Sequence, residues 1–180
     1  MKKALLFTLG LIAVGCAEPI PDLGEMRTLA EQGDAGAQNN LGAMYESGTG
    51  VQEDAAEAAR WYRLAAGQGE AVAQSNLGRM YHNGEGVPED AAEAGRWYRL
   101  AAEQGYAHAQ GVLGLIYASG EGVPRDMVLA YMWFNLAAAQ GQEDAQGNKD
   151  LAEQGMTRAQ INEAQRMSRE WIEEHPPGGN

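Results

Sequence analysis

Residues 66–101 read AGQGEAVAQSNLGRMYHNGEGVPEDAAEAGRWYRLA, and residues 30–65 carry the same letter at 26 of these 36 positions. The frame continues over residues 102–137, which gives three full units with a period of 36 residues. A fragment of a unit precedes them at 23–31, and a degenerate one follows at 138–155. A period of this length is typical of small helical units that stack along one axis.

Each unit is expected to form two helices that a glycine-rich turn separates. In the first unit, Ala37, Leu41 and Tyr45 share one helical face, and the glycines from Gly48 onward end that helix. An aspartate then caps the second helix of each unit, at Asp54, Asp90 and Asp126. Tryptophans recur at the same step and are expected in the core between units, at Trp61, Trp97 and Trp133.

A glycine lies inside each first helix, at Gly42, Gly78 and Gly114. Glycine at such a position costs roughly 1 kcal/mol relative to alanine. We expect the close approach of a neighbouring backbone to offset that cost.

The first 17 residues have the layout of a secretory signal peptide, with Lys2 and Lys3 before an apolar run and small residues after it. Two cleavage patterns fit. Residues 13–16 resemble a lipobox, so cleavage before Cys16 would free this cysteine for lipid attachment; cleavage after Ala17 would release a soluble protein. Residues 18–22 then form a short extended spacer.

The other end of the chain is expected to close the array. Thr157 and Gln160 have capping-box spacing, which predicts a capping helix within residues 156–175 and a tail over 176–180. The last unit of a stacked array needs such a cover with a polar outer side. Trp171 is expected to belong to the core beneath this helix.

Composition excludes several function classes. The formal net charge is −12, which disfavours binding to a phosphate backbone. The single cysteine excludes an intrachain disulfide and a cysteine-rich zinc site, and none of the three histidines has a second ligand at metal-binding spacing. Local serine-nucleophile motifs do not occur. We therefore expect neither a metal, nor a cofactor, nor an enzymatic activity.

The unit pattern resembles the Sel1-like repeats, relatives of the tetratricopeptide repeats. The resemblance rests on A-x-x-x-L-G-x-x-Y-x-x-G-x-G-V-x-x-D over 37–54 and A-x-x-W-x-x-x-A-A-x-x-G over 58–69, and both recur in the later units. It implies an all-α fold, a right-handed α/α superhelical solenoid over 23–155 with a C-terminal capping helix. It also implies a surface presented to other proteins. Some secreted relatives carry a disulfide in each repeat and have β-lactamase-like activity, whereas the repeats of this chain contain no cysteine.

The sequence therefore predicts a non-enzymatic scaffold or adaptor of the bacterial cell envelope, which binds a protein segment on the concave face of the solenoid. An envelope hydrolase and a peptidoglycan-binding module are the alternatives. The expected protein is periplasmic, lipid-anchored through Cys16 and monomeric, and its acidic charge favours a partner with a basic patch. The candidate binding residues are positions on the first helices that differ between units: Asn39, Ala43, Glu46, Ser75, Arg79, His82 and Leu115.

Overall fold

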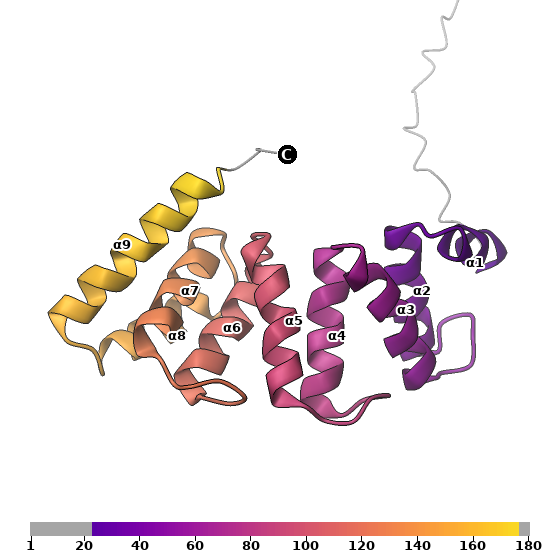
Figure 1. Ribbon diagram of the computed structural model, residues 1–180, viewed down its shortest axis with the longest axis horizontal. Coiled ribbons are helices and arrows are strands. Elements are labelled where there is room, and N and C mark those ends of the chain that lie inside the picture. The colour runs from indigo at the N-terminus through magenta and orange to yellow at the C-terminus, as the bar shows by residue number, and fades with distance from the viewer. Residues whose placement is uncertain (1–22, 177–180) are drawn as a thin grey trace, which may run out of the picture.

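A computed structural model describes residues 23–176, and over these residues the chain forms helices and no strand. The helices are α1 (Leu23–Glu31), α2 (Ala35–Ser47), α3 (Ala55–Gly67), α4 (Ala71–Asn83), α5 (Ala91–Glu103), α6 (Ala107–Ser119), α7 (Met127–Ala139), α8 (Ala145–Glu153) and α9 (Arg158–Glu174). They follow one another along the long axis of the molecule (Figure 1). The expected all-α solenoid is confirmed.

The predicted signal peptide with Cys16 and the predicted spacer lie outside the described residues, as does the tail beyond Pro176. Within residues 23–176, no helix has both the length and the apolar character that crossing a bilayer requires.

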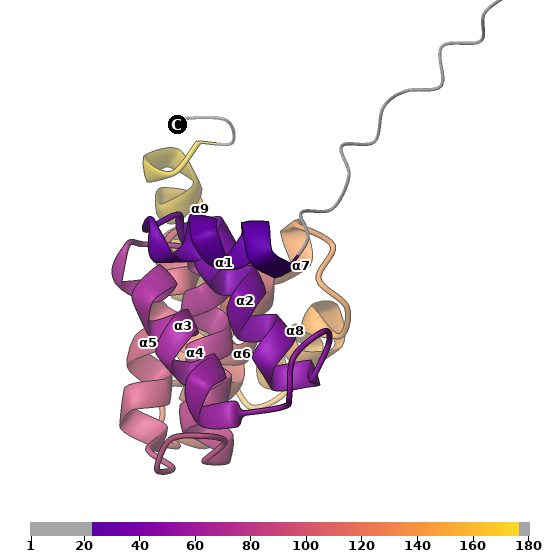
Figure 2. The same ribbon diagram turned by 90° about the vertical axis from the view of Figure 1, so that its right-hand side faces the viewer.

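The three full units form the helix pairs α2/α3, α4/α5 and α6/α7, in which every helix has 13 residues. Seen along the array, α3 and α5 lie on one side and α2 and α8 on the other (Figure 2). We call the exposed surface of α2, α4 and α6 the A-helix face, and that of α3, α5 and α7 the B-helix face.

Local sequence fixes the ends of these helices as expected. The carboxylate of Asp54 accepts a hydrogen bond from the backbone N–H of Glu57 at 3.0 Å, and Asp90 accepts one from Glu93 at 2.9 Å. Asp126 does the same for the first turn of α7. At the other end of α2, Gly48 takes a left-handed conformation with φ of 69°, which glycine adopts at little steric cost.

The core runs between the units, as the recurring tryptophans predicted. Trp61 and Trp133 are each 6% exposed, and Trp97 is partly buried. Small alanines fill the space between these rings and let the helices approach closely. Because each helix pair buries its apolar side against the next pair, the array depends on contacts between units.

The expectation for the glycines inside the first helices was wrong in one respect. The group that crowds each glycine is an aromatic ring of the second helix in the same unit, not a neighbouring backbone. A Cβ atom would lie 2.8 Å from the Tyr62 ring at Gly42, 3.1 Å from the Tyr98 ring at Gly78 and 2.6 Å from the Phe134 ring at Gly114. The ring of the partner helix thus leaves little room for a Cβ atom at these positions, least of all at Gly114.

The final helix packs across α7 (Figure 1). The predicted capping box is present, since the Thr157 hydroxyl accepts from the Gln160 backbone and the Gln160 side chain accepts from the Thr157 backbone. Trp171 packs against the core, with its ring centroid 6.3 Å from that of Trp133. The α9 helix thus covers the end of the core.

Candidate partner-binding face

The predicted binding residues lie on the three helices of the A-helix face. The helix α2 supplies Asn39, Ala43 and Glu46, α4 supplies Ser75, Arg79 and His82, and α6 supplies Leu115. These helices are successive first helices of the units, so their exposed side chains form a surface that crosses all three units.

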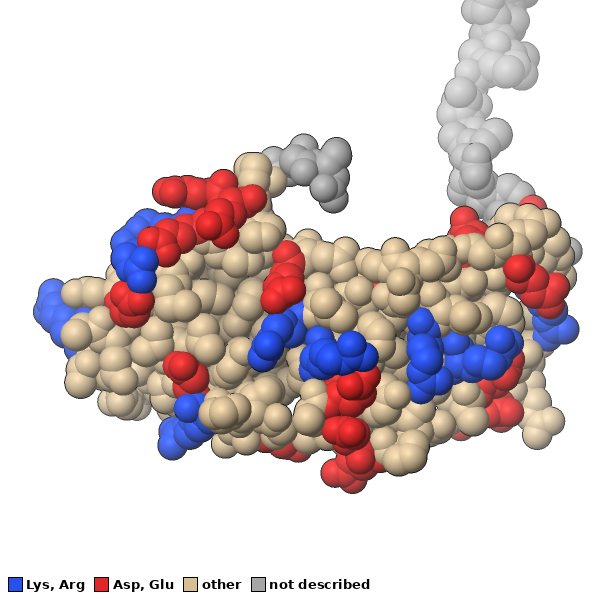
Figure 3. Space-filling view, in the orientation of Figure 1, with Lys and Arg blue, Asp and Glu red and all other residues tan. Residues whose placement is uncertain are grey.

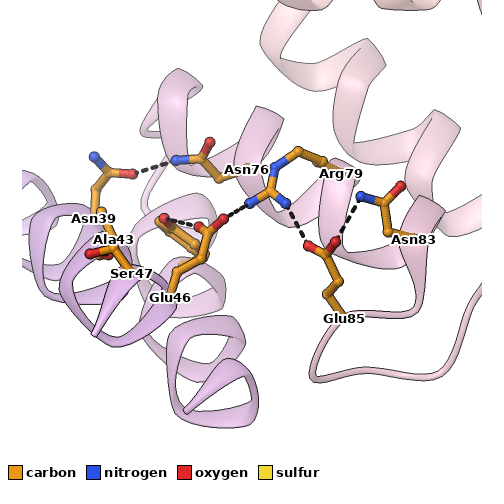
Figure 4. Close-up of polar contacts among 9 residues, drawn as sticks. Asn39, Ala43, Glu46, Ser47, Asn76, Arg79, Asn83 and Glu85 are labelled. Atoms are coloured by element: carbon orange, nitrogen blue, oxygen red, sulfur yellow. Dashed lines mark hydrogen bonds and ion pairs between the residues drawn. The ribbon is translucent and has the colours of Figure 1, made fainter. Parts of the chain in front are cut away.

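A charged cluster joins the first two units on this face. The guanidinium of Arg79 pairs with Glu46 of the preceding unit and, at 2.5 Å, with Glu85 of its own unit (Figure 4). Tyr62 donates its hydroxyl hydrogen to Glu46 at 2.7 Å. Burial and this hydrogen bond raise the pKa of the Tyr62 hydroxyl far above its usual value, so it remains a donor even at a pH where an exposed tyrosine has ionised. Arg79 and Glu46 are therefore held in place rather than free in solvent.

Two amides extend the same row. Asn76 donates to Asn39 at 3.2 Å, which links α4 to α2 (Figure 4). The sequence prediction did not select Asn76, which matches Asn40 of the first unit and differs only from Val112 of the third. It missed Glu85 because this residue lies in the turn after α4 and not on the helix.

On this face, an exposed histidine and an exposed carboxylate link the second and third units. His82 lies 3.6 Å from the carboxylate of Glu121, and both side chains are about half exposed, at 45% and 50%. Leu115 is exposed to 49%, which is high for a leucine on a packed helix. Ala43 is also exposed. The face thus offers carboxylates beside uncovered apolar side chains.

Ser75 lies below the surface, because it is only 3% exposed. Its hydroxyl is 3.3 Å from Nδ1 of His108, a residue of α6 whose side chain is exposed. The exposed imidazole of His108 therefore lies against a buried Ser75 hydroxyl. Burial of this kind depends on the packing of α6 against α4, so the position of Ser75 within its own unit did not reveal it.

Buried glutamines connect the units beneath this surface and were not predicted. Gln110 is fully buried; its amide donates to the backbone carbonyl of Ala102 at 3.2 Å, and it accepts from Gln140 at 2.8 Å. The same pair of bonds recurs one and two periods earlier, around Gln74 and Gln38. The sequence did contain a signal for these bonds: each unit has a glutamine three residues before its Leu-Gly pair. This ladder fixes the stacking of the units and hence the shape of the A-helix face.

Among residues 23–176, no group of three His, Cys, Asp or Glu side chains converges in a way that could hold a metal ion. The arrangement on the A-helix face is one of ion pairs and exposed apolar side chains, which suits contact with another chain.

Comparison with known proteins agrees with the repeated architecture. The Sel1 repeat model matches residues 35–70, 71–106 and 107–142. The crystal structure of a protective antigen present in uropathogenic Escherichia coli strains, which displays an SLR fold, is 41% identical with a TM-score of 0.79. That match covers 86% of this chain and 33% of the antigen, so the chain spans about a third of the antigen's length.

The crystal structure of a Sel1 repeat protein from Oxalobacter formigenes is also 41% identical, with a TM-score of 0.68. This match covers 73% of the present chain and 98% of the other. No curated protein matches the chain.

Proposed function

The chain belongs to the Sel1 repeat family, whose fold is typical of protein–protein interaction scaffolds, and from this premise we propose that it is a non-enzymatic adaptor that binds a protein partner on the A-helix face. The observation that carries the proposal is the row of fixed charges and uncovered apolar side chains across α2, α4 and α6. Such a row lets one extended or helical segment touch several units at once.

The chemistry of the face indicates the kind of segment. Two carboxylates, Glu46 and Glu85, pair with the single guanidinium of Arg79, and a third, Glu121, lies beside His82, which leaves an excess of negative charge. Leu115 adds an apolar contact beside them. A segment in which Lys or Arg side chains alternate with apolar ones would satisfy both features. The chain's net charge of −12 would steer a basic partner toward this face.

The cellular place of this adaptor is proposed from the sequence. The signal-like residues 1–17 and the lipobox-like stretch ending at Cys16 support export, with lipid attachment at the periplasmic face of the envelope. Replacement Cys16→Ser should move the protein from the membrane fraction to the soluble periplasmic fraction. A protein that is soluble with either residue at position 16 would contradict the lipid anchor and favour cleavage after Ala17.

Affinity capture from envelope extracts tests the binding face. Two variants, Leu115→Asp and Glu121→Lys, alter the A-helix face at exposed positions and should reduce recovery of the specific partner. Two controls make the same chemical changes at exposed positions on α9, Ile172→Asp and Glu173→Lys, and should not. Equal recovery with all four variants would refute the proposed face. Co-sedimentation with purified peptidoglycan that both A-helix-face variants leave intact would favour the glycan-binding alternative instead.

A further inference from the structure

One helix of the B-helix face, α7, already holds a docked helix, because α9 packs against it. Met132 and Leu136 of α7 lie one helical turn apart and are 5% and 2% exposed. The Ser168 side chain of α9 contacts the Met132 carbonyl at 3.5 Å, and the Trp171 ring lies against Trp133. The outer side of a second helix in this fold is therefore a surface on which an amphipathic helix fits.

The same surface is uncovered on α3 and α5. One period before Leu136 lies Leu100, and two periods before it lies Leu64. These leucines are 36% and 43% exposed, whereas Leu136 is 2% exposed. The leucine position is thus repeated three times along the chain, and it is buried on α7, the helix against which α9 packs, while it is exposed on α3 and α5.

Charge distinguishes the uncovered sites from the covered one. An arginine precedes each exposed leucine, at Arg63 and Arg99, and the basic side chains form a row over α3 and α5 (Figure 3). Arg63 donates to the Tyr81 hydroxyl at 3.0 Å and Arg99 to the Tyr117 hydroxyl at 2.7 Å. These neutral partners orient the guanidinium groups without cancelling their charge. Neither arginine forms an ion pair with a carboxylate among residues 23–176.

We propose that Arg63, Leu64, Arg99 and Leu100, which we call the basic–leucine strip, dock an acidic amphipathic helix of a partner protein. The leucines would receive the apolar stripe of that helix, as α7 receives α9. The two guanidinium groups would pair with carboxylates that flank the stripe, since arginine binds carboxylates with two parallel hydrogen bonds. The strip is basic within an acidic chain and lies on α3 and α5, whereas the A-helix face lies on α2, α4 and α6. It therefore selects a second partner whose charge is opposite to that proposed for the A-helix face.

A peptide derived from α9 provides the probe, because its apolar stripe already fits this kind of surface. The peptide comprises residues 156–176 with the changes Arg158→Glu, Arg166→Glu and Arg169→Glu and carries a fluorescent label. Its control keeps the three arginines and replaces the four glutamates with lysine, at Glu163, Glu170, Glu173 and Glu174. Binding to the full-length protein is measured by fluorescence anisotropy at low and at high salt.

The acidic peptide should bind, and the lysine peptide should not. The double variant Leu64→Ser/Leu100→Ser should weaken binding at least about tenfold, and Arg63→Gln/Arg99→Gln should weaken it and reduce its salt dependence. Leu115→Ser on the A-helix face is the matched control and should leave peptide binding unchanged. Circular dichroism shows whether each variant is folded; all of these side chains are exposed, so we expect unchanged spectra.

Four results would overturn the proposal. The first two would be failure of the acidic peptide to bind and equal binding of the lysine peptide. The third would be unchanged binding to the variant Leu64→Ser/Leu100→Ser, which would mean that the peptide replaces α9 on α7. The fourth would be binding of anionic lipid vesicles, but not of the peptide, through Arg63 and Arg99, which would assign the strip to a lipid surface. Leu115→Ser changes only the A-helix face. None of these four results therefore bears on the proposal for the A-helix face, which has its own test.

Discussion

Alanine substitution of the glycines inside the first helices tests the packing of each helix pair in a graded way. Alanine gains about 1 kcal/mol of helix propensity over glycine wherever space allows. At Gly114 the new Cβ atom would lie 2.6 Å from the ring of Phe134, which is 2% exposed and cannot move away. Overpacking of a filled core costs about 1–3 kcal/mol. Since the overlap is severe, we expect Gly114→Ala to lower the free energy of unfolding by about 1–2 kcal/mol.

At the other glycines, the effect of alanine on stability should follow the distance from the new Cβ atom to its nearest neighbour. At Gly78 the Tyr98 ring lies 3.1 Å away and needs to shift only slightly, so the overlap and the gain in propensity should nearly cancel. At Gly147, within α8, nothing lies within 4 Å, and Gly147→Ala should stabilise the protein by about 0.5–1 kcal/mol.

Urea denaturation gives these free energies, and thermal melting should follow by about 2–4 °C per kcal/mol for a chain of this size. If Gly114→Ala and Gly147→Ala changed stability equally, or if Gly114→Ala were stabilising, the ring-contact explanation would be refuted.

Three further changes test separate parts of the structure. Gln110→Leu removes a buried donor to the Ala102 carbonyl and takes away the acceptor of the Gln140 amide, so it should cost about 1–3 kcal/mol in urea denaturation, whereas the exposed Gln146→Leu should change little. Burial raises the pKa of Tyr98 to about 12. The protonated Tyr98 therefore contributes its full stability below pH 10.0, and this contribution is lost as the pH rises through about 12. Tyr98→Phe should remove one late step from the tyrosinate absorbance titration. The hydrogen bond from Arg60 lowers the pKa of Glu57. The ionised Glu57 therefore stabilises the folded protein fully above the ordinary carboxyl range, and this stability is lost as the pH falls through the lowered pKa. Glu57→Gln should flatten the acid side of the stability profile.

The sequence predicted the features that depend on neighbouring residues. The two helices per unit, the aspartate caps such as Asp54 and the capping box at Thr157 follow from spacings of a few residues, and the period of 36 residues follows from direct repetition of the same letters. Burial of the recurring tryptophans also followed, because a side chain repeated in the helical frame of every unit fits the seam between units. These rules are local, so one sequence is enough to apply them.

Contacts between units could not be predicted in the same way. The bond from Gln68 to Gln38 spans 30 residues and exists only once the units have stacked at a particular angle. The burial of Ser75 depends on that angle too, as does the ring that meets each helical glycine. Residues that differ between units located the A-helix face, but the ion pairs that organise it, such as Arg79 with Glu46, required the relative placement of two units.

Photo-crosslinking in living cells tests the central claim, that the A-helix face contacts a partner, most directly. A photoreactive amino acid replaces Ala43 or Leu115 on that face, and Ala159 on α9 serves as the exposed control. We predict that Ala43 and Leu115 yield an adduct with the same protein, through a segment rich in Lys or Arg, and that Ala159 does not. Absence of an adduct from both A-helix-face positions, or an identical adduct from Ala159, would contradict the account.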